Sequence, residues 1–156
     1  MKKNKLREHI KKGQPLLSTR FWSTQPFFWE AIGETGIFDY VEFLAEYAPY
    51  DLTDLPNIAR AAELNDMGTM IKVDFQNRGF VAQKAIQAGF QSIMFVDHTS
   101  AEQVRESVNL VKPKTENGTG IFGYPNGRCI GGQSHIPILD HVERLEDIVL
   151  CFMIEK

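Results

Sequence analysis

The sequence predicts an α/β fold built around a parallel sheet, and two observations support this prediction. About five short apolar segments, rich in β-branched and aromatic residues, alternate with segments whose apolar residues recur at helical spacing. Polar and charged residues gather where these apolar segments end. Strands that alternate with helices in this way form βαβ units, in which the strands run parallel and the crossovers are right-handed.

The individual elements follow from the same periodicities. We expect strands at residues 15–22, 39–45, 68–73, 91–96 and 148–154. We expect helices at residues 1–12, 25–34, 52–65, 78–88, 100–111 and 137–147. Gly36 and Gly89 are expected to end two of the helices, and Ser100 is expected to begin another.

Three of the helices have apolar residues that we expect to share one buried face. The sets are Leu6 and Ile10; Phe28, Ala31 and Ile32; and Leu139, Val142 and Leu145. The remaining long loop, residues 113–133, is rich in glycine but has neither a GxGxxG nor a GxxxxGK[ST] pattern after a strand. We therefore interpret it as an active-site or subunit-contact loop, and not as a nucleotide-binding loop.

Composition limits the possible class of protein. The 156 residues, 43% of them hydrophobic and 24% charged, suit a single domain over 1–156. The net charge of −3 argues against nucleic acid as a partner, and no apolar run approaches the length of a membrane span. Only Cys129 and Cys151 are present, which predicts neither a disulfide framework nor a zinc site and favours a cytoplasmic location.

Counting the β/α units points to a (β/α)8 TIM barrel. The polar residues near the strand ends are Arg20, Glu46, Tyr47, Asp74, Asp97, His98 and Glu155. In such barrels the carboxyl ends of the strands carry the chemistry, but a complete barrel takes about 250 residues. The chain therefore corresponds to about the first five β/α units, the N-terminal part of a barrel.

Glu155 and Lys72 are the two charged residues whose positions most clearly indicate a chemical role. Glu155 follows the last apolar strand, where a carboxylate can bind a hard divalent cation; as an alternative it is a solvated acid. Lys72 lies inside an apolar strand, where it can bind a substrate carboxylate or act as a Schiff-base amine. The alternative for Lys72 is an ion pair with Glu46 or Asp74.

Two polar pairs at strand ends have similar alternatives. Glu46 and Tyr47 can serve as proton acceptor and donor, or they can be part of a turn fixed by Pro49. Asp97 and His98 can bind metal or exchange protons, but a turn that precedes a helix cap is the commoner use of such residues. For His141 a surface position is the simpler expectation.

Four segments, taken together, resemble the HpcH/HpaI aldolase family of metal-dependent (class II) 2-oxo acid aldolases. They are Glu46-Tyr47-Ala48-Pro49, Ile71-Lys72, Gln87-Ala88-Gly89 and Ile154-Glu155. The resemblance runs over essentially the whole chain but covers only about the first three-fifths of such a barrel. It therefore implies a C-terminally truncated member of the family.

The resemblance also implies roles for individual residues. Glu155 would be the first of two acidic ligands of a divalent metal, Mg or Mn and possibly Co or Zn. Lys72 stands where the family usually has the arginine that binds the pyruvate carboxylate and enolate. Tyr47 stands where the family has histidine in D-G-E-H-A-P, and Gln87 where it often has that histidine's aspartate partner.

These departures imply a divergent subgroup that handles protons differently, through Glu46, Tyr47 or water. We accordingly assign catalysis to Lys72, Glu46 and Tyr47, substrate binding to Lys72 and Arg20, and metal binding to Glu155. The expected reaction is the cleavage or formation of a carbon–carbon bond next to a pyruvate-type enolate. A 2-oxo acid is the expected small-molecule substrate, and a homo-oligomer is the expected assembly.

Two other interpretations remain open. The chain can be a non-catalytic half-barrel that associates with itself to cover its sheet edge and barrel interior. Alternatively, the same site can perform another enolate chemistry, such as a condensation like that of citrate synthase.

Overall fold

The strands form one parallel sheet in the predicted order. The computed structural model describes residues 3–124, 127–130 and 137–155. Within these residues the strands are β1 (Ser18–Phe21), β2 (Tyr40–Leu44), β3 (Gly68–Val73), β4 (Ser92–Phe95) and β5 (Val149–Phe152). Each strand pairs with its sequence neighbour, so the sheet order is β1-β2-β3-β4-β5. The predicted sheet of consecutive βαβ units is therefore confirmed.

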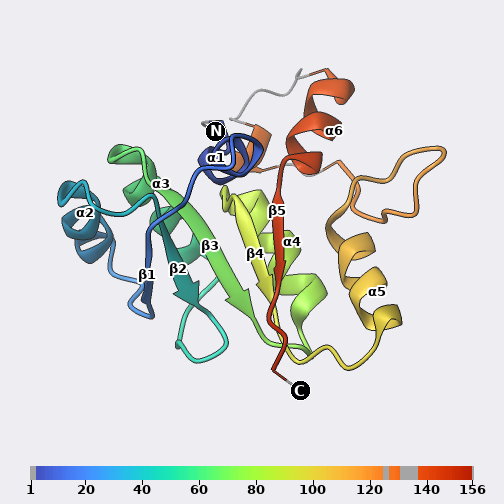
Figure 1. The fold of residues 1–156 in the computed structure, drawn as a ribbon, viewed down its shortest axis with the longest axis horizontal. Coiled ribbons are helices and arrows are strands. Elements are labelled where there is room, and N and C mark those ends of the chain that lie inside the picture. Colours follow the sequence, from blue (N-terminus) through green and yellow to red (C-terminus); the bar gives the residue numbers. More distant parts are fainter. Residues whose placement is uncertain (1–2, 125–126, 131–136, 156) are drawn as a thin grey trace.

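Helices precede and connect these strands. They are α1 (Lys5–Lys11), α2 (Pro26–Glu34), α3 (Asp54–Leu64), α4 (Arg78–Ala88), α5 (Ala101–Val111), the 3-10 helix η1 (Arg128–Ile130) and α6 (Ile138–Glu146). Figure 1 shows α3 and α4 behind the sheet, with the strands pointing downward toward the chain's C-terminus. Gly89 ends α4 with φ at 109°, and the Ser100 side chain caps α5 by accepting from the backbone N–H of Gln103.

The two faces of the sheet differ in character because successive side chains of a strand point to opposite sides. Val41, Phe43, Ile71 and Val73 belong to the main apolar core, which lies between the sheet and the helices. Alternate residues face the other way and form a second surface that we call the inner face. Its members include Glu42, Leu44, Met70, Lys72, Met94 and Cys151. In a closed barrel this face lines the interior.

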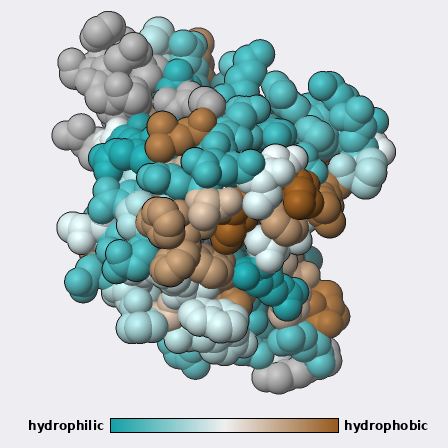
Figure 2. Space-filling view, turned by 90° about the vertical axis from the view of Figure 1, so that its left-hand side faces the viewer, coloured by the Kyte–Doolittle hydropathy of each residue, from teal (hydrophilic) through white to brown (hydrophobic). Residues whose placement is uncertain are grey.

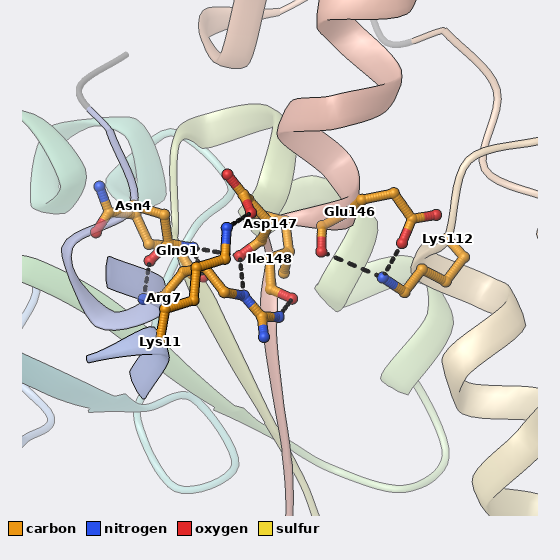
Figure 3. A network of polar contacts seen from close by, with 8 residues as sticks. All are labelled: Asn4, Arg7, Lys11, Gln91, Lys112, Glu146, Asp147 and Ile148. Carbon is orange, nitrogen blue, oxygen red and sulfur yellow. Dashed lines mark hydrogen bonds and ion pairs between the residues drawn. The ribbon is translucent and has the colours of Figure 1, made fainter. Parts of the chain in front are cut away.

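Helix α1 closes the amino-terminal end of the inner face. Leu6 is buried against Met70 and Val149, and a side chain at Gly68 would collide with it. Polar contacts hold the helix in place, as Figure 3 shows: the Asn4 amide donates to the carbonyls of Gln91 and Asp147. Arg7 donates to the carbonyls of Asp147 and Ile148, next to the start of β5. The N-terminal segment thus fixes where β5 begins.

Several predicted helix faces were wrong in detail. Ile10, Phe28 and Leu139 are exposed, whereas Trp29 and His141 are buried. In α2 the buried position is Trp29, whose ring meets Phe21 and Phe43 edge-on. Phe28 and Ala31 lie outside the core because α2 is covered on only one side. The strand expected to reach Ile154 ends at Phe152.

Arg128, in the second described part of the glycine-rich loop, docks at the amino-terminal end of the sheet. Arg128 forms an ion pair with Glu63 near the end of α3, and it donates to the carbonyl of Ala88 at the end of α4. Helices of βαβ units run antiparallel to the strands, so the ends of α3 and α4 lie opposite the catalytic edge. Arg128 therefore does not cover the predicted site. Residues 125–126 and 131–136 of the predicted loop and its flank lie outside the described residues.

An apolar surface accompanies the unpaired edge strand β1. Trp22, Phe27 and Phe28 are exposed in and around α2, and Figure 2 shows apolar side chains gathered on this side of the molecule. A closed barrel buries both edges of its sheet. None of the helices in the described part of the chain has the length and hydrophobicity needed to cross a bilayer.

Candidate functional site

Lys72, Glu46 and Tyr47 come together at the carboxyl-terminal edge of the sheet. Lys72 is the second-last residue of β3, and its Nζ lies 2.7 Å from Glu46 Oε2. The same ammonium donates to Tyr47 Oη at 3.0 Å. The backbone N–H of Glu46 also donates to the Lys72 carbonyl, which ties the turn after β2 to β3. The three residues that sequence reasoning assigned to catalysis are thus in mutual contact.

The environment of Lys72 keeps its side chain protonated. The Lys72 side chain is 8% exposed and that of Glu46 19% exposed. Burial alone would lower the pKa of Lys72, but hydrogen bonds to Glu46 and Tyr47 and their charges outweigh it, so the pKa is raised above its usual value. A Schiff-base lysine must lose its proton to attack a carbonyl. The geometry therefore favours a fixed cation over a nucleophilic amine.

Arg20 lies on the same face of the sheet but forms a different contact. It is a residue of β1 in register with Glu42 of β2, and not a residue beyond the strand end. Its Nε lies 3.0 Å from Glu42 Oε2, while its side chain is 62% exposed. Glu42 is 4% exposed, and its Oε1 has no hydrogen-bond partner among the described residues.

Glu42 is the residue that sequence reasoning missed. It lies within the apolar segment 39–45 and has no recognisable motif around it. The available signal was an acid at an inward-facing position of a buried parallel strand, where hydrophobic residues are the rule. Burial of a carboxylate is costly unless it is paired, so such a position indicates a dedicated partner.

Glu155 is exposed and lies three residues beyond the end of β5. No group of three or more His, Cys, Asp or Glu side chains within the described residues could hold a metal ion. Mg²⁺ is usually held by one or two carboxylates together with waters and substrate oxygens. The described residues supply one such carboxylate at this position and do not by themselves make up the site that the family resemblance implies.

Asp97 and His98 support the turn-and-cap interpretation. Asp97 follows β4 with φ at 57°, a left-handed conformation that aspartate tolerates better than most residues. His98 packs edge-on against Phe75, Phe95 and Phe152, and its Nε2 lies 2.7 Å from Ser107 Oγ on α5. The His98 ring therefore faces the helix-covered side of the sheet, away from Lys72.

The pKa of His98 gives a testable pH dependence. Burial lowers it below the ordinary value of 6.5, and the charge of Arg78 acts in the same direction. The unfolded chain therefore binds more protons at this histidine than the folded chain does below about pH 7, so folding stability is complete above pH 6.5 and falls as the pH drops through it. We expect His98→Gln, measured by urea unfolding between pH 5 and 8, to flatten this fall. If the pH dependence of stability is the same in His98→Gln as in the unaltered protein, burial of His98 does not cause the fall.

A separate groove of about 530 Å³ lies between α4 and α5. Its lining includes Arg78, Phe80, Leu110 and Ile121, and none of the predicted site residues. Arg78 is already engaged there by Ser107, Glu106 and the Phe75 carbonyl. The predicted site residues on the inner face of the sheet therefore lie outside this groove.

Comparison with known proteins identifies the fold. No protein-family model and no curated protein sequence matches the chain. An HpcH/HpaI aldolase/citrate lyase family protein from Burkholderia cenocepacia J2315 is similar in structure, with a TM-score of 0.80 and 20% identity over 96% of this chain and 58% of the other.

Two further solved structures are similar. The citrate synthase SbnG has a TM-score of 0.79 and 20% identity over 99% of this chain and 57% of its own. Macrophomate synthase has a TM-score of 0.76 and 18% identity over 95% and 52%. The chain spans a little over half the length of each of these proteins. It therefore has the fold of HpcH/HpaI aldolase family proteins, in the form of five parallel strands and their connecting helices from part of a TIM-type barrel.

Proposed function

We propose that the protein acts as an aldolase-type lyase on a 2-oxo acid, forming or cleaving a carbon–carbon bond next to a pyruvate-type enolate. The observation that carries the proposal is the buried Lys72, whose ammonium nitrogen contacts Glu46 and Tyr47 at the carboxyl-terminal edge of the sheet. A fixed cation in a partly dehydrated site stabilises negative charge that develops on a substrate oxygen. The similar enzymes with this fold support the proposal at the level of the fold.

The proposed steps use only the residues of this chain. Glu46 or Tyr47 takes the proton of the substrate's 4-hydroxyl group, and the C3–C4 bond then breaks to release an aldehyde. The electron pair of that bond passes to the 2-oxo group, where Lys72 balances the charge of the resulting enolate. The group that took the hydroxyl proton then returns a proton to the enolate carbon, directly or through water, which gives pyruvate or a homologue.

The family resemblance adds a divalent cation, with Mg²⁺ or Mn²⁺ expected and Glu155 as one ligand. Such an ion would act as a Lewis acid toward the 2-oxo group. Because the described residues supply only that one ligand, this part of the proposal depends on the resemblance alone.

The direct test is proton exchange at the methyl group of pyruvate in D2O, followed by NMR with and without Mg²⁺ or Mn²⁺. We expect exchange by the purified protein, together with pyruvate release from 4-hydroxy-2-oxo acids in a lactate dehydrogenase assay. Absence of both reactions at any metal concentration would sink the proposal and favour a non-catalytic, self-associating half-barrel.

The similarity to a citrate synthase supports one second candidate, condensation of an enolate with another 2-oxo acid. Exchange at the methyl group of pyruvate belongs to the lyase reaction, whereas in the condensation the enolate forms at the methyl group of an acetyl donor. Condensation predicts a new carbon–carbon bond from oxaloacetate and an acetyl donor, whereas the lyase reaction predicts cleavage of 4-hydroxy-2-oxo acids without a donor.

A further inference from the structure

We propose that the groove between α1 and α6 binds a free α-amino acid through both its carboxylate and its ammonium group. The groove has a volume of about 430 Å³ and lies at the amino-terminal end of the sheet, beside the start of β5. Lys72 lies at the opposite edge, so this site is separate from the candidate catalytic site and does not depend on the proposed lyase function. Of the described residues that line the groove, four are cationic and three are acidic.

Each wall of the groove is a polar face of one helix. On α1 the face includes Asn4, Arg7 and Lys11, which follow one another at three- and four-residue intervals. On α6 it includes Glu143 and Asp147, which are one helical turn apart. Because both faces carry charges, apolar packing does not close the space between them.

A few direct contacts join the two walls. The Lys11 ammonium lies 3.2 Å from Asp147 Oδ1. Arg7 donates through Nε and Nη2 to the carbonyls of Asp147 and Ile148, at 3.2 and 3.0 Å, as Figure 3 shows. A carbonyl carries no full charge, so Arg7 has no carboxylate partner among the described residues. Its Nη1 also remains available as a donor.

Charges of both signs stay unpaired across the groove. Lys3 and Arg7 line it on the N-terminal side, and Glu143 lines it on the α6 side. None of these three side chains forms an ion pair with another residue of the described chain, although an ion pair needs only a separation within about 4 Å. The opposite charges on the two walls therefore do not meet directly. A small molecule with one charge of each sign can bridge them.

Arg7 binds the carboxylate of the ligand, and Glu143 binds its ammonium group. Two carbonyls hold the guanidinium of Arg7 from one side, which fixes the direction of its remaining donors. Glu143 stands four residues before Asp147, whose carbonyl Arg7 contacts, and side chains at this spacing lie about 5–6 Å apart on a helix. The two charged groups of an α-amino acid share one carbon atom, so they suit neighbouring partners of this kind.

The charge balance of the groove disfavours a phosphate. Four cations and three acids leave a net charge of +1 in the described lining. A phosphate dianion at Arg7 would bring two negative charges close to Glu8 and Asp147, which line the same groove. An amino acid adds no net charge and gives the acidic wall a partner. The amphoteric ligand is therefore the better match.

Binding of L-alanine, propionate and ethylamine to the purified protein tests this two-group recognition by saturation-transfer NMR and calorimetric titration. Propionate lacks the ammonium group of alanine, and ethylamine lacks its carboxylate. We expect alanine to bind at least about tenfold more tightly than either, because each analogue loses a charge-assisted hydrogen bond. Equal affinities for alanine and propionate, no binding of alanine, or tighter binding of inorganic phosphate would each overturn the proposal.

Two variants assign the charged groups to their walls. Glu143→Gln should lower the affinity for alanine about tenfold and leave that for propionate within about twofold, because it removes only the partner of the ammonium group. Glu34→Gln, at an exposed glutamate of α2, is the matched control and should change neither affinity. Arg7→Met should weaken alanine and propionate alike, whereas Arg60→Met, at an exposed arginine of α3, should weaken neither.

Folding and location are checked in the same experiment. Arg7 also holds α1 against the start of β5, so urea unfolding is measured for Arg7→Met. If that variant does not fold, Glu143→Gln still decides, since the Glu143 carboxylate contacts no described residue that its loss would release. Lys72→Met should leave the affinity for alanine within about twofold. Loss of alanine binding in Lys72→Met and not in Glu143→Gln would place the ligand at the candidate catalytic site and overturn the proposal.

Discussion

Replacing Lys72 with methionine is expected to lower the rate of pyruvate methyl exchange by about 10²- to 10³-fold, the usual cost of removing one oxyanion donor. Methionine keeps the length and apolar stem of the side chain but removes the ammonium that Glu46 and Tyr47 hold in place. The exchange rate, measured by NMR at saturating pyruvate, is the readout. A rate within about twofold of the original would contradict the assigned role of Lys72.

Two variants serve as controls for this experiment. Lys84→Met makes the same change on α4, where the ammonium contacts Gln87 and the ring of Phe80, and should leave the exchange rate unchanged. Lys72→Arg keeps the charge but cannot repeat the single-point geometry, so we expect partial activity.

Loss of folding must be separated from loss of chemistry in Lys72→Met. Removing the ammonium leaves Glu46 without its partner, which we expect to cost about 1–3 kcal/mol of unfolding free energy, less than for a fully buried pair. The double variant Lys72→Met with Glu46→Gln should recover part of that stability without recovering activity. Recovery of both would mean that Lys72 has a structural role only.

Replacing Trp29 with alanine is expected to lower the free energy of unfolding by about 3–5 kcal/mol. Trp29 is fully buried, its ring meets Phe21 and Phe43, and its Nε1 donates to the Ser23 carbonyl. The variant removes the contact that joins α2 to β1 and β2. Urea unfolding followed by circular dichroism gives the measurement.

Phe28→Ala is the matched comparison for Trp29→Ala. Phe28 is the adjacent aromatic residue and is 47% exposed, with edge-on contacts to Phe21 and Phe27. We expect it to cost less than about 1.5 kcal/mol. Equal destabilisation by the two substitutions would show that the buried face of α2 differs from the one described.

The fold could be predicted from the sequence because its signals are local. Residues 68–73 and 78–88 carry a strand and a helix within their predicted bounds, since an apolar run, a helical period and Gly89 all lie within a few residues. The burial of individual helix residues could not be predicted as well. The first four residues of α2 are all apolar or aromatic, so periodicity does not choose between Phe28 and Trp29.

The site was predictable in part for the same reason. Lys72, Glu46 and Tyr47 stand near strand ends, and parallel strands bring such ends to one edge. Their mutual contact was one of several alternatives, because the sequence did not distinguish an ion pair with Glu46 from one with Asp74. The structure resolved this through the turn that the Glu46 N–H makes with the Lys72 carbonyl.

The sequence by itself determined the order of strands and helices, the parallel sheet, and the charged residues available at its edge. Only the tertiary structure decided that Lys72 is held protonated, that Arg20 belongs to β1 beside Glu42, and that His98 faces the helices. The reason is physical: backbone periodicity is set by neighbouring residues. Charge pairing and burial, in contrast, depend on which strands lie side by side, and a distance of 22 residues separates Arg20 from Glu42.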